Sequence, residues 1–147
     1  MEYVNKIRLE MQSCSENEAL ARTVAASFVA ELDPTMEELT EIRTAISEAV
    51  SNAVIHAYGG EKDGQIILEA VSLPSGKVIF TVEDKGKGIE DIAKAREPLF
   101  TTGPAGERSG MGFTVMESFM DKLQVESSPG QGTRVTMVKL LDRSYGF

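Results

Sequence analysis

Two strand-like stretches, residues 65–72 and 77–84, are separated by only four residues, and this spacing constrains the fold more than any other feature of the sequence. The connecting residues 73–76 read Leu-Pro-Ser-Gly, and proline and glycine at these places favour a tight turn. Strands that are joined by a tight turn pair in antiparallel directions. The middle of the chain therefore predicts a β-hairpin, and an antiparallel sheet around it.

Two helices are predicted before this hairpin. Each begins at a capping-box pattern, a Ser or Thr followed three residues later by Glu. The two patterns are Ser15 with Glu18 and Thr35 with Glu38, and the helices that they open run over about residues 16–32 and 36–57. Asp33-Pro34 breaks the first helix, and the glycines after Tyr58 stop the second.

The other predicted elements complete a two-layer arrangement. They are a half-buried strand at residues 3–12, a short helix near 90–95, a helix at about 110–120, and strands near 122–127 and 132–140. Few helices and one sheet imply an α/β two-layer sandwich, in which a mixed, mostly antiparallel sheet is covered on one face by helices. The length suits one domain of ordinary size, so we expect residues 1–147 to form a single domain.

The composition argues against several function classes. With 23 acidic and 15 basic residues the formal net charge is −8, which disfavours direct binding to nucleic acid or to an anionic membrane and suits a partner with a basic patch. One cysteine and one histidine allow neither an intrachain disulfide nor a Cys/His metal cage. Because the sequence shows no membrane-spanning apolar run and no signal-peptide pattern, we expect a cytoplasmic protein.

Polar side chains follow one another along the predicted helix 36–57. Glu48, Asn52 and His56 are spaced four residues apart, so they lie on one line beside the apolar stripe. A carboxylate there can orient or deprotonate a nucleophile, and an amide oxygen can hold a hard cation such as Mg²⁺. The alternative, which the spacing alone favours, is a solvated helix face with a weak local hydrogen bond. His56 by itself is more typical of capping or packing.

A carboxylate is also predicted at the end of strand 77–84. Phe80, Val82 and Asp84 share one face, which carries the Asp84 side chain between the two layers. Gly86 and Gly88 open the backbone beside it. A buried carboxylate needs a partner, and an exocyclic amine such as that of adenine would satisfy it. An ordinary loop Asp with two turn glycines is the alternative, and the pattern alone does not decide between them.

Glycines recur where the helix at 110–120 begins. Residues 108–113 read Arg-Ser-Gly-Met-Gly-Phe, which places backbone N–H groups at a helix N-terminus, where anions bind. Arg108 would add a bidentate contact to phosphate. No Walker loop occurs in the sequence, and a glycine-rich hinge is the alternative. Residues 130–133, Gly-Gln-Gly-Thr, are by themselves typical of a hairpin turn.

Taken in order, these motifs resemble the Bergerat (GHKL) ATP-binding fold. The ordered set covers residues 36–141 and comprises Glu48-x-x-x-Asn52, Asp84-x-Gly86-x-Gly88, Gly110-x-Gly112 and Gly132-Thr133. A finer resemblance covers nearly the whole chain. Residues 32–42, 47–53, 98–102 and 107–113 are similar to the sporulation anti-sigma F factors.

This resemblance implies a function. The family is a homodimeric serine protein kinase that binds and inhibits sigma factor F. It also phosphorylates a serine of an anti-anti-sigma protein with ATP and Mg²⁺. Carried onto this sequence, the resemblance implies that Glu48 is the catalytic base and that Asn52 is the Mg²⁺ ligand and contacts the nucleotide. Arg22, on the first helix, matches the arginine of the family's partner-binding surface.

The same resemblance assigns the adenine end of the site. It implies that Asp84 reads the adenine amine, that Gly86 and Gly88 line that pocket, and that Thr133 supports it.

At the phosphate end, residues 97–109 would form a lid that includes Thr101 and Ser109 as nucleotide contacts. Arg108 would contact the γ-phosphate, and Gly110 and Gly112 would admit the phosphate chain.

Three rival functions remain open. A histidine kinase catalytic domain needs a helical domain with a phosphoacceptor histidine, whereas His56 lies within the ATP-site helix. An anti-sigma kinase of the general stress response would share the fold and the chemistry. A non-catalytic scaffold that sequesters its partner in an ATP-dependent way would not need a base, so Glu48 separates it from a kinase.

Overall fold

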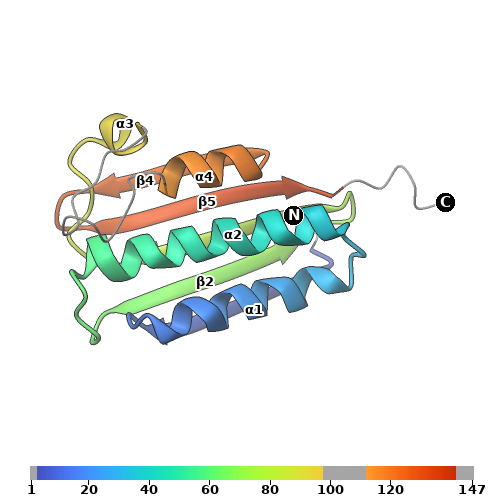
Figure 1. The fold of residues 1–147 in the computed structure, drawn as a ribbon, viewed down its shortest axis with the longest axis horizontal. Coiled ribbons are helices and arrows are strands. Elements are labelled where there is room, and N and C mark those ends of the chain that lie inside the picture. The colour runs from blue at the N-terminus through green and yellow to red at the C-terminus, as the bar shows by residue number, and fades with distance from the viewer. Residues whose placement is uncertain (1–2, 98–111, 142–147) are drawn as a thin grey trace.

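The computed structural model describes residues 3–97 and 112–141, and these residues build a five-stranded sheet with helices packed on it (Figure 1). The strands lie in the order β1-β2-β3-β5-β4. Their bounds are Asn5–Gln12 (β1), Gln65–Ser72 (β2), Lys77–Asp84 (β3), Lys122–Ser128 (β4) and Gly132–Leu140 (β5). All four pairings are antiparallel, so the expected parallel component of a mixed sheet does not occur among the described strands.

Three helices cover one face of the sheet, and α2 lies between the other two (Figure 1). They are α1 (Glu16–Ala30), α2 (Met36–Asn52) and α4 (Gly112–Phe119), while the four-residue α3 (Ile92–Ala95) stands beside one end of the sheet. The core fills the space between α2 and the central strands, where Ile42, Ile46, Leu68 and Phe80 are fully buried. The two-layer sandwich that the sequence predicted is confirmed.

The local signals in the sequence had different outcomes. The predicted hairpin has strand bounds identical to those expected, and Thr35 forms the predicted capping box with Glu38. The capping box at Ser15 is wrong. Ser15 has helical backbone angles and makes no side-chain cap, whereas an N-cap side chain acts from an extended residue. Glu18 instead accepts a hydrogen bond from the Ser47 hydroxyl at 2.9 Å, and α1 ends two residues early, at Ala30.

The second helix changes character after Asn52. Residues Ala53–Ala57 form a π-helical turn, η1, in which the Tyr58 N–H reaches back five residues to the Ala53 carbonyl at 3.2 Å. Such turns are rare in proteins as a whole, but those that occur are frequently found at functional sites. The sequence predicted one continuous helix to residue 57, so this turn is a new feature.

A buried ion pair fixes α4 to the rest of the fold. Lys139, on the helix-facing side of β5, is 7% exposed. Its Nζ donates to Glu41 Oε1 at 2.8 Å and to the Phe119 carbonyl at 2.6 Å. The second bond satisfies a carbonyl at the C-terminal end of α4. The first joins that end to α2, so the position of α4 is set relative to α2 and the sheet.

Within residues 3–97 and 112–141, no helix is long and apolar enough to cross a bilayer.

Candidate functional site

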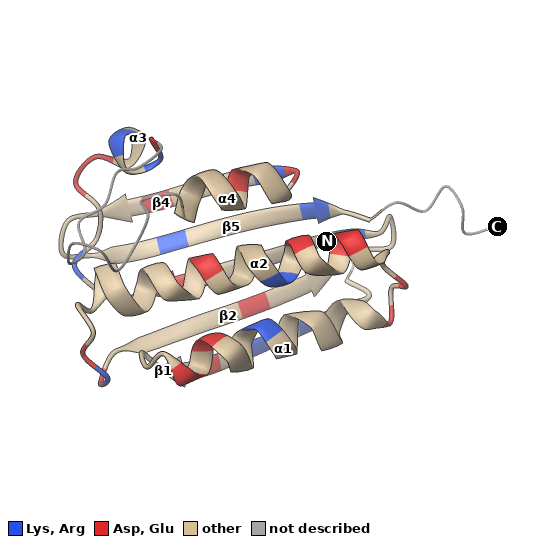
Figure 2. Ribbon diagram, viewed as in Figure 1, with Lys and Arg blue, Asp and Glu red and all other residues tan. Residues whose placement is uncertain are grey.

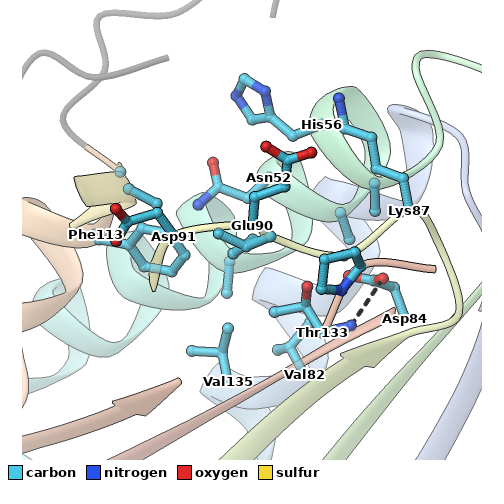
Figure 3. Close-up of a pocket in the computed structure, with 18 of the residues that line it drawn as sticks. Asn52, His56, Val82, Asp84, Lys87, Glu90, Asp91, Phe113, Thr133 and Val135 are labelled. Atoms are coloured by element: carbon cyan, nitrogen blue, oxygen red, sulfur yellow. Dashed lines mark hydrogen bonds between the residues drawn. The ribbon is translucent and has the colours of Figure 1, made fainter. Parts of the chain in front are cut away.

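A cavity of about 670 Å³ opens between the C-terminal end of α2 and the sheet (Figure 3). Asn52 and His56 enter it from α2 and η1, and Val82 and Val135 lie below them on the sheet. The remaining walls come from the segment after β3, from the start of α4 and from the β4–β5 turn. Among their lining residues are Asp84, Lys87, Gly88, Glu90, Asp91, Lys94, Gly112, Phe113, Pro129 and Thr133.

Asp84 is the polar centre of this cavity. Its side chain is on the buried face of β3, and the residue is 7% exposed. Oδ1 accepts a hydrogen bond from the Thr133 N–H at 3.2 Å (Figure 3). It also accepts one from the Gly86 N–H at 2.9 Å. Both of these bonds end on one oxygen, and no hydrogen bond from residues 3–97 or 112–141 ends on Oδ2. Oδ2 is therefore available to a donor that enters the cavity.

Burial sets the electrostatic state of this carboxylate. Desolvation raises the pKa of Asp84 above its ordinary value, and the hydrogen bonds from Gly86 and Thr133 offset the rise only in part. The charge of Glu83 raises the pKa further. A buried carboxyl group with a raised pKa, whose second oxygen accepts no hydrogen bond from the described residues, is typical of a group that serves a ligand.

Two glycines after β3 allow the backbone to come close to neighbouring segments. A Cβ atom at Gly86 would overlap the Ala57 carbonyl oxygen, and a Cβ atom at Gly88 would overlap the Ser128 carbonyl oxygen. Gly88 also has a φ of +77°, which favours glycine. The segment after Asp84 is therefore wedged between the π turn of α2 and the β4–β5 turn.

The floor of the cavity beside Asp84 is apolar. Val82 and Val135 are 3% and 5% exposed, and Ala49 and Ala53 of the helix face them with 2% and 3% exposed. A slot between small aliphatic side chains, with one carboxylate oxygen at its edge, suits a flat heteroaromatic ring that carries an amine.

The structure brings together five of the residues that the sequence assigned to nucleotide binding. Asn52, Asp84, Gly88, Gly112 and Thr133 all line the same cavity. The Thr133 hydroxyl also shares a 2.8 Å hydrogen bond with Ser127.

Other assigned residues lie elsewhere. Glu48 is one turn before Asn52 on α2 but is not among the lining residues, and Gly86 lies behind the wall, against Ala57. Arg22 is on α1, where its Nη1 donates to Ser47 Oγ at 3.1 Å.

The assignments to Thr101, Arg108, Ser109 and Gly110 fall outside the residues that the structure describes.

Several wall residues were not found from the sequence. His56 was expected to cap or pack, yet it lines the cavity one turn beyond Asn52. The signal was present, since His56 continues the four-residue spacing of Glu48 and Asn52. Lys87 and Phe113 lie next to assigned glycines, and only the folded backbone places them at the cavity.

Comparison with known proteins defines the class. A family model described as the histidine kinase-like ATPase domain matches residues 11–139. Solved structures agree with it on the fold: the RsbU and RsbW domains of Rv1364c from Mycobacterium tuberculosis align with a TM-score of 0.69 at 21% identity, over 94% of this chain and 33% of that one. The catalytic domain of the histidine kinase ThkA aligns with a TM-score of 0.57 at 19% identity, over 96% of this chain and 97% of that one. The chain is an ATP-binding domain of this class.

Relatives in sequence narrow the assignment. The anti-sigma F factor of Pasteuria penetrans is 54% identical over 140 residues, which cover 95% of this chain and 93% of the relative. The anti-sigma F factor of Bacillus subtilis strain 168 is 51% identical over 140 residues, which cover 95% of each chain. The chain belongs to the anti-sigma F factor family, whose members are serine kinases built on this ATPase domain.

The raised pKa of Asp84 predicts a gain in stability from Asp84→Asn at neutral pH. The asparagine oxygen can keep both backbone hydrogen bonds, while the desolvated charge is removed. Because the folded pKa is raised, the wild-type penalty is full above that pKa and vanishes below the unfolded value of about 3.9. Urea denaturation without nucleotide should therefore show a larger free energy of unfolding for Asp84→Asn at pH 7, and a difference from wild type that shrinks as the pH falls and is lost below about pH 3.9.

Asp63→Asn is the matched control, because Asp63 is an exposed turn residue. A lower stability of Asp84→Asn at pH 7, or a difference from wild type that does not change with pH, would contradict this prediction.

Proposed function

We propose that this protein is an ATP-dependent serine kinase that phosphorylates an anti-anti-sigma protein and, in its nucleotide-bound state, binds and inhibits sigma factor F. The observation that carries the proposal is the cavity in which Asn52 of α2 faces Asp84 of β3. It occurs in a chain that is 51–55% identical over nearly its full length to anti-sigma F factors.

The adenine base is assigned to the Asp84 end of the cavity. Asp84 Oδ2 would accept a hydrogen bond from the adenine amine, while Val82 and Val135 contact the face of the ring. Thr133 supports the carboxylate from behind through its N–H. The amine is a donor where a guanine or hypoxanthine ring carries an acceptor oxygen, so this contact selects adenine.

The phosphates are assigned to the opposite end, beside Asn52 and the start of α4. Gly112 is the first residue of this eight-residue helix and lines the cavity, so a phosphate there would meet backbone N–H groups. Arg108, Ser109, Gly110 and Thr101 are proposed to complete this end as the sequence suggests.

The residues present fit a Mg²⁺ ion of the kind that accompanies nucleotides. No cluster of three or more acidic, histidine or cysteine ligands exists among the described residues, so a dedicated metal cage is not found there. Mg²⁺ commonly takes only one or two protein ligands besides phosphates and waters. The amide oxygen of Asn52, at the cavity wall, is the proposed ligand. Bound there, the ion would neutralise charge on the phosphates.

Glu48 is proposed as the general base. It lies one turn before Asn52 on the same helix. Its carboxylate would take the proton of the partner's serine hydroxyl as the serine oxygen bonds to the γ-phosphorus. The bond from that phosphorus to the bridging oxygen breaks, and ADP leaves. A serine hydroxyl is a weak nucleophile, so a positioned base should contribute about 10²–10⁴-fold to the rate.

The protein partners follow from the same proposal. Acidic and basic residues both occur along the helices that cover the sheet, and α1 carries both signs (Figure 2). The formal net charge of −8 suits a basic sigma factor. The partner-binding surface would include Arg22. The active species would be a homodimer in which each copy consists of one ATP-binding domain. Since sigma factors act on RNA polymerase, the site of action would be the cytoplasm.

Replacing Glu48 by Gln should slow phosphate transfer about 10²–10⁴-fold while ATP affinity changes little, because the amide keeps the shape but cannot take a proton. The measurement is transfer of labelled phosphate from ATP to the purified anti-anti-sigma protein, with the dissociation constant of ATP determined in parallel. Glu37→Gln, on the exposed start of the same helix, is the matched control. Unchanged transfer by Glu48→Gln would remove Glu48 from the mechanism.

Replacing Arg22 by Glu should weaken binding of sigma factor F and leave ATP affinity intact. Arg22 lies on α1, where it donates to Ser47, and it is not among the residues that line the cavity. The measurement is a pull-down of sigma factor F with ATP and with ADP. Arg43→Glu, an exposed arginine on α2, makes the same charge change. Equal weakening by both variants would mean that net charge, and not an Arg22 contact, governs binding.

A further inference from the structure

The hydroxyl of Tyr58 lies at the point where β2 and β3 separate. The strand register pairs Ile66 with Asp84, so Gln65 and Lys85 come opposite each other next. The Tyr58 hydroxyl bridges these two residues. It accepts a hydrogen bond from the Lys85 N–H at 2.7 Å and donates one to the Gln65 carbonyl at 2.6 Å. The Tyr58 hydroxyl thus stands where the next backbone hydrogen bond between β2 and β3 would otherwise form.

The π turn of α2 carries the Tyr58 ring to this place. The Tyr58 N–H bonds to the Ala53 carbonyl, which closes the wide turn. On its other side the ring lies against Gly64, where a Cβ atom would come within 2.6 Å of the ring carbons. The Tyr58 ring therefore packs in the space that Gly64 leaves by having no side chain. This packing and the two hydrogen bonds of the hydroxyl fix the orientation of the ring.

Three consecutive backbone N–H groups after Asp84 are each held by a different acceptor. The Lys85 N–H is held by Tyr58, the Gly86 N–H by Asp84 Oδ1 at 2.9 Å, and the Lys87 N–H by the Ala57 carbonyl at 3.2 Å. Two of these three acceptors, Ala57 and Tyr58, lie at the end of the π turn that follows Asn52. The segment that orients Asp84 is therefore attached to the helix that carries Asn52.

We propose that Tyr58 is a positioning residue of the nucleotide site, which sets the backbone at Lys85 and thereby directs Asp84 Oδ2 toward the base. The inference rests on the proposed role of Asp84 in reading the adenine amine. Tyr58 itself is not among the residues that line the cavity. Without the hydroxyl, the Gln65 carbonyl and the Lys85 N–H are left to pair directly. The two strands then close further, and Asp84, one residue before Lys85, turns with them.

The test is the Tyr58→Phe variant, which keeps the ring and removes only the hydroxyl. Dissociation constants are measured by titration calorimetry for ATP and for inosine triphosphate, which carries an oxygen where adenine has its amine. Wild type should prefer ATP. Tyr58→Phe should bind ATP on the order of tenfold more weakly, since about one hydrogen bond is lost or misdirected, and inosine triphosphate almost unchanged. The ratio of the two constants should therefore fall.

Ser13→Ala is the matched control. The Ser13 hydroxyl also bridges two backbone groups near the same turn, because it donates to the Glu61 carbonyl and accepts from the Gly64 N–H at 3.0 Å. It makes no contact with Lys85. The variant should lose stability but keep the wild-type ratio of dissociation constants. Because both nucleotides are compared on one preparation, the ratio does not depend on the fraction of protein that is folded.

The outcomes separate this inference from the proposed function. A wild-type ratio in Tyr58→Phe would overturn the positioning role while the role of Asp84 stands. An equal fall in Ser13→Ala would also overturn it, because the effect would then be general loosening of the turn. If wild type itself binds both nucleotides equally, the role of Asp84 is wrong and the role of Tyr58 falls with it. Asp84→Asn, which replaces the acceptor at Oδ2 by a donor, should reverse the preference.

Discussion

A carboxylate carried into the interior at the end of a strand is the constraint on which the rest of the site depends. Asp84 follows Phe80 and Val82 on the helix-facing side of β3 and is almost as buried as they are. One of its oxygens is fully used by the Gly86 and Thr133 N–H groups. The structure tolerates the raised pKa of this residue because the backbone on both sides is shaped to supply those two bonds. The second oxygen accepts no hydrogen bond from the described residues, so it is available to a ligand.

The second constraint is the change of helix type after Asn52. A regular α-helix through residue 57 would keep the polar line of Glu48, Asn52 and His56 but would not direct the Ala57 carbonyl to Lys87. In the π turn the Ala57 carbonyl accepts from the Lys87 N–H, which joins the end of the helix to the loop after Asp84. The two halves of the cavity, one on α2 and one on the sheet, are therefore joined by hydrogen bonds of the backbone at residues 85 and 87.

The sequence predicted those parts of the fold that depend on local signals. The hairpin bounds followed from alternation and from the Leu-Pro-Ser-Gly turn, and the Thr35 cap followed from a single spacing. It predicted the burial of Asp84 from its shared face with Phe80 and Val82. It did not predict the failure of Ser15 as a cap, because Glu18 is taken by Ser47 on another helix. The role of Tyr58 was missed because its hydroxyl bonds to Gln65 and Lys85, which come close to it only when the sheet has formed. The π turn was missed because its defining bond, from the Tyr58 N–H to the Ala53 carbonyl, differs from that of an α-helix by one residue, which helical spacing in the sequence does not show.

Asp84 is proposed to bind the amine of adenine with Oδ2, the oxygen that accepts no hydrogen bond from the described residues. The most direct measurement is a crystal structure of the protein with a non-hydrolysable ATP analogue. The account predicts that the adenine amine lies within about 2.7–3.2 Å of Asp84 Oδ2, and that Oδ1 still accepts from Gly86 and Thr133. An adenine ring that lies outside the cavity, or whose amine is bonded to another group while Asp84 Oδ2 makes no contact with the base, would contradict it.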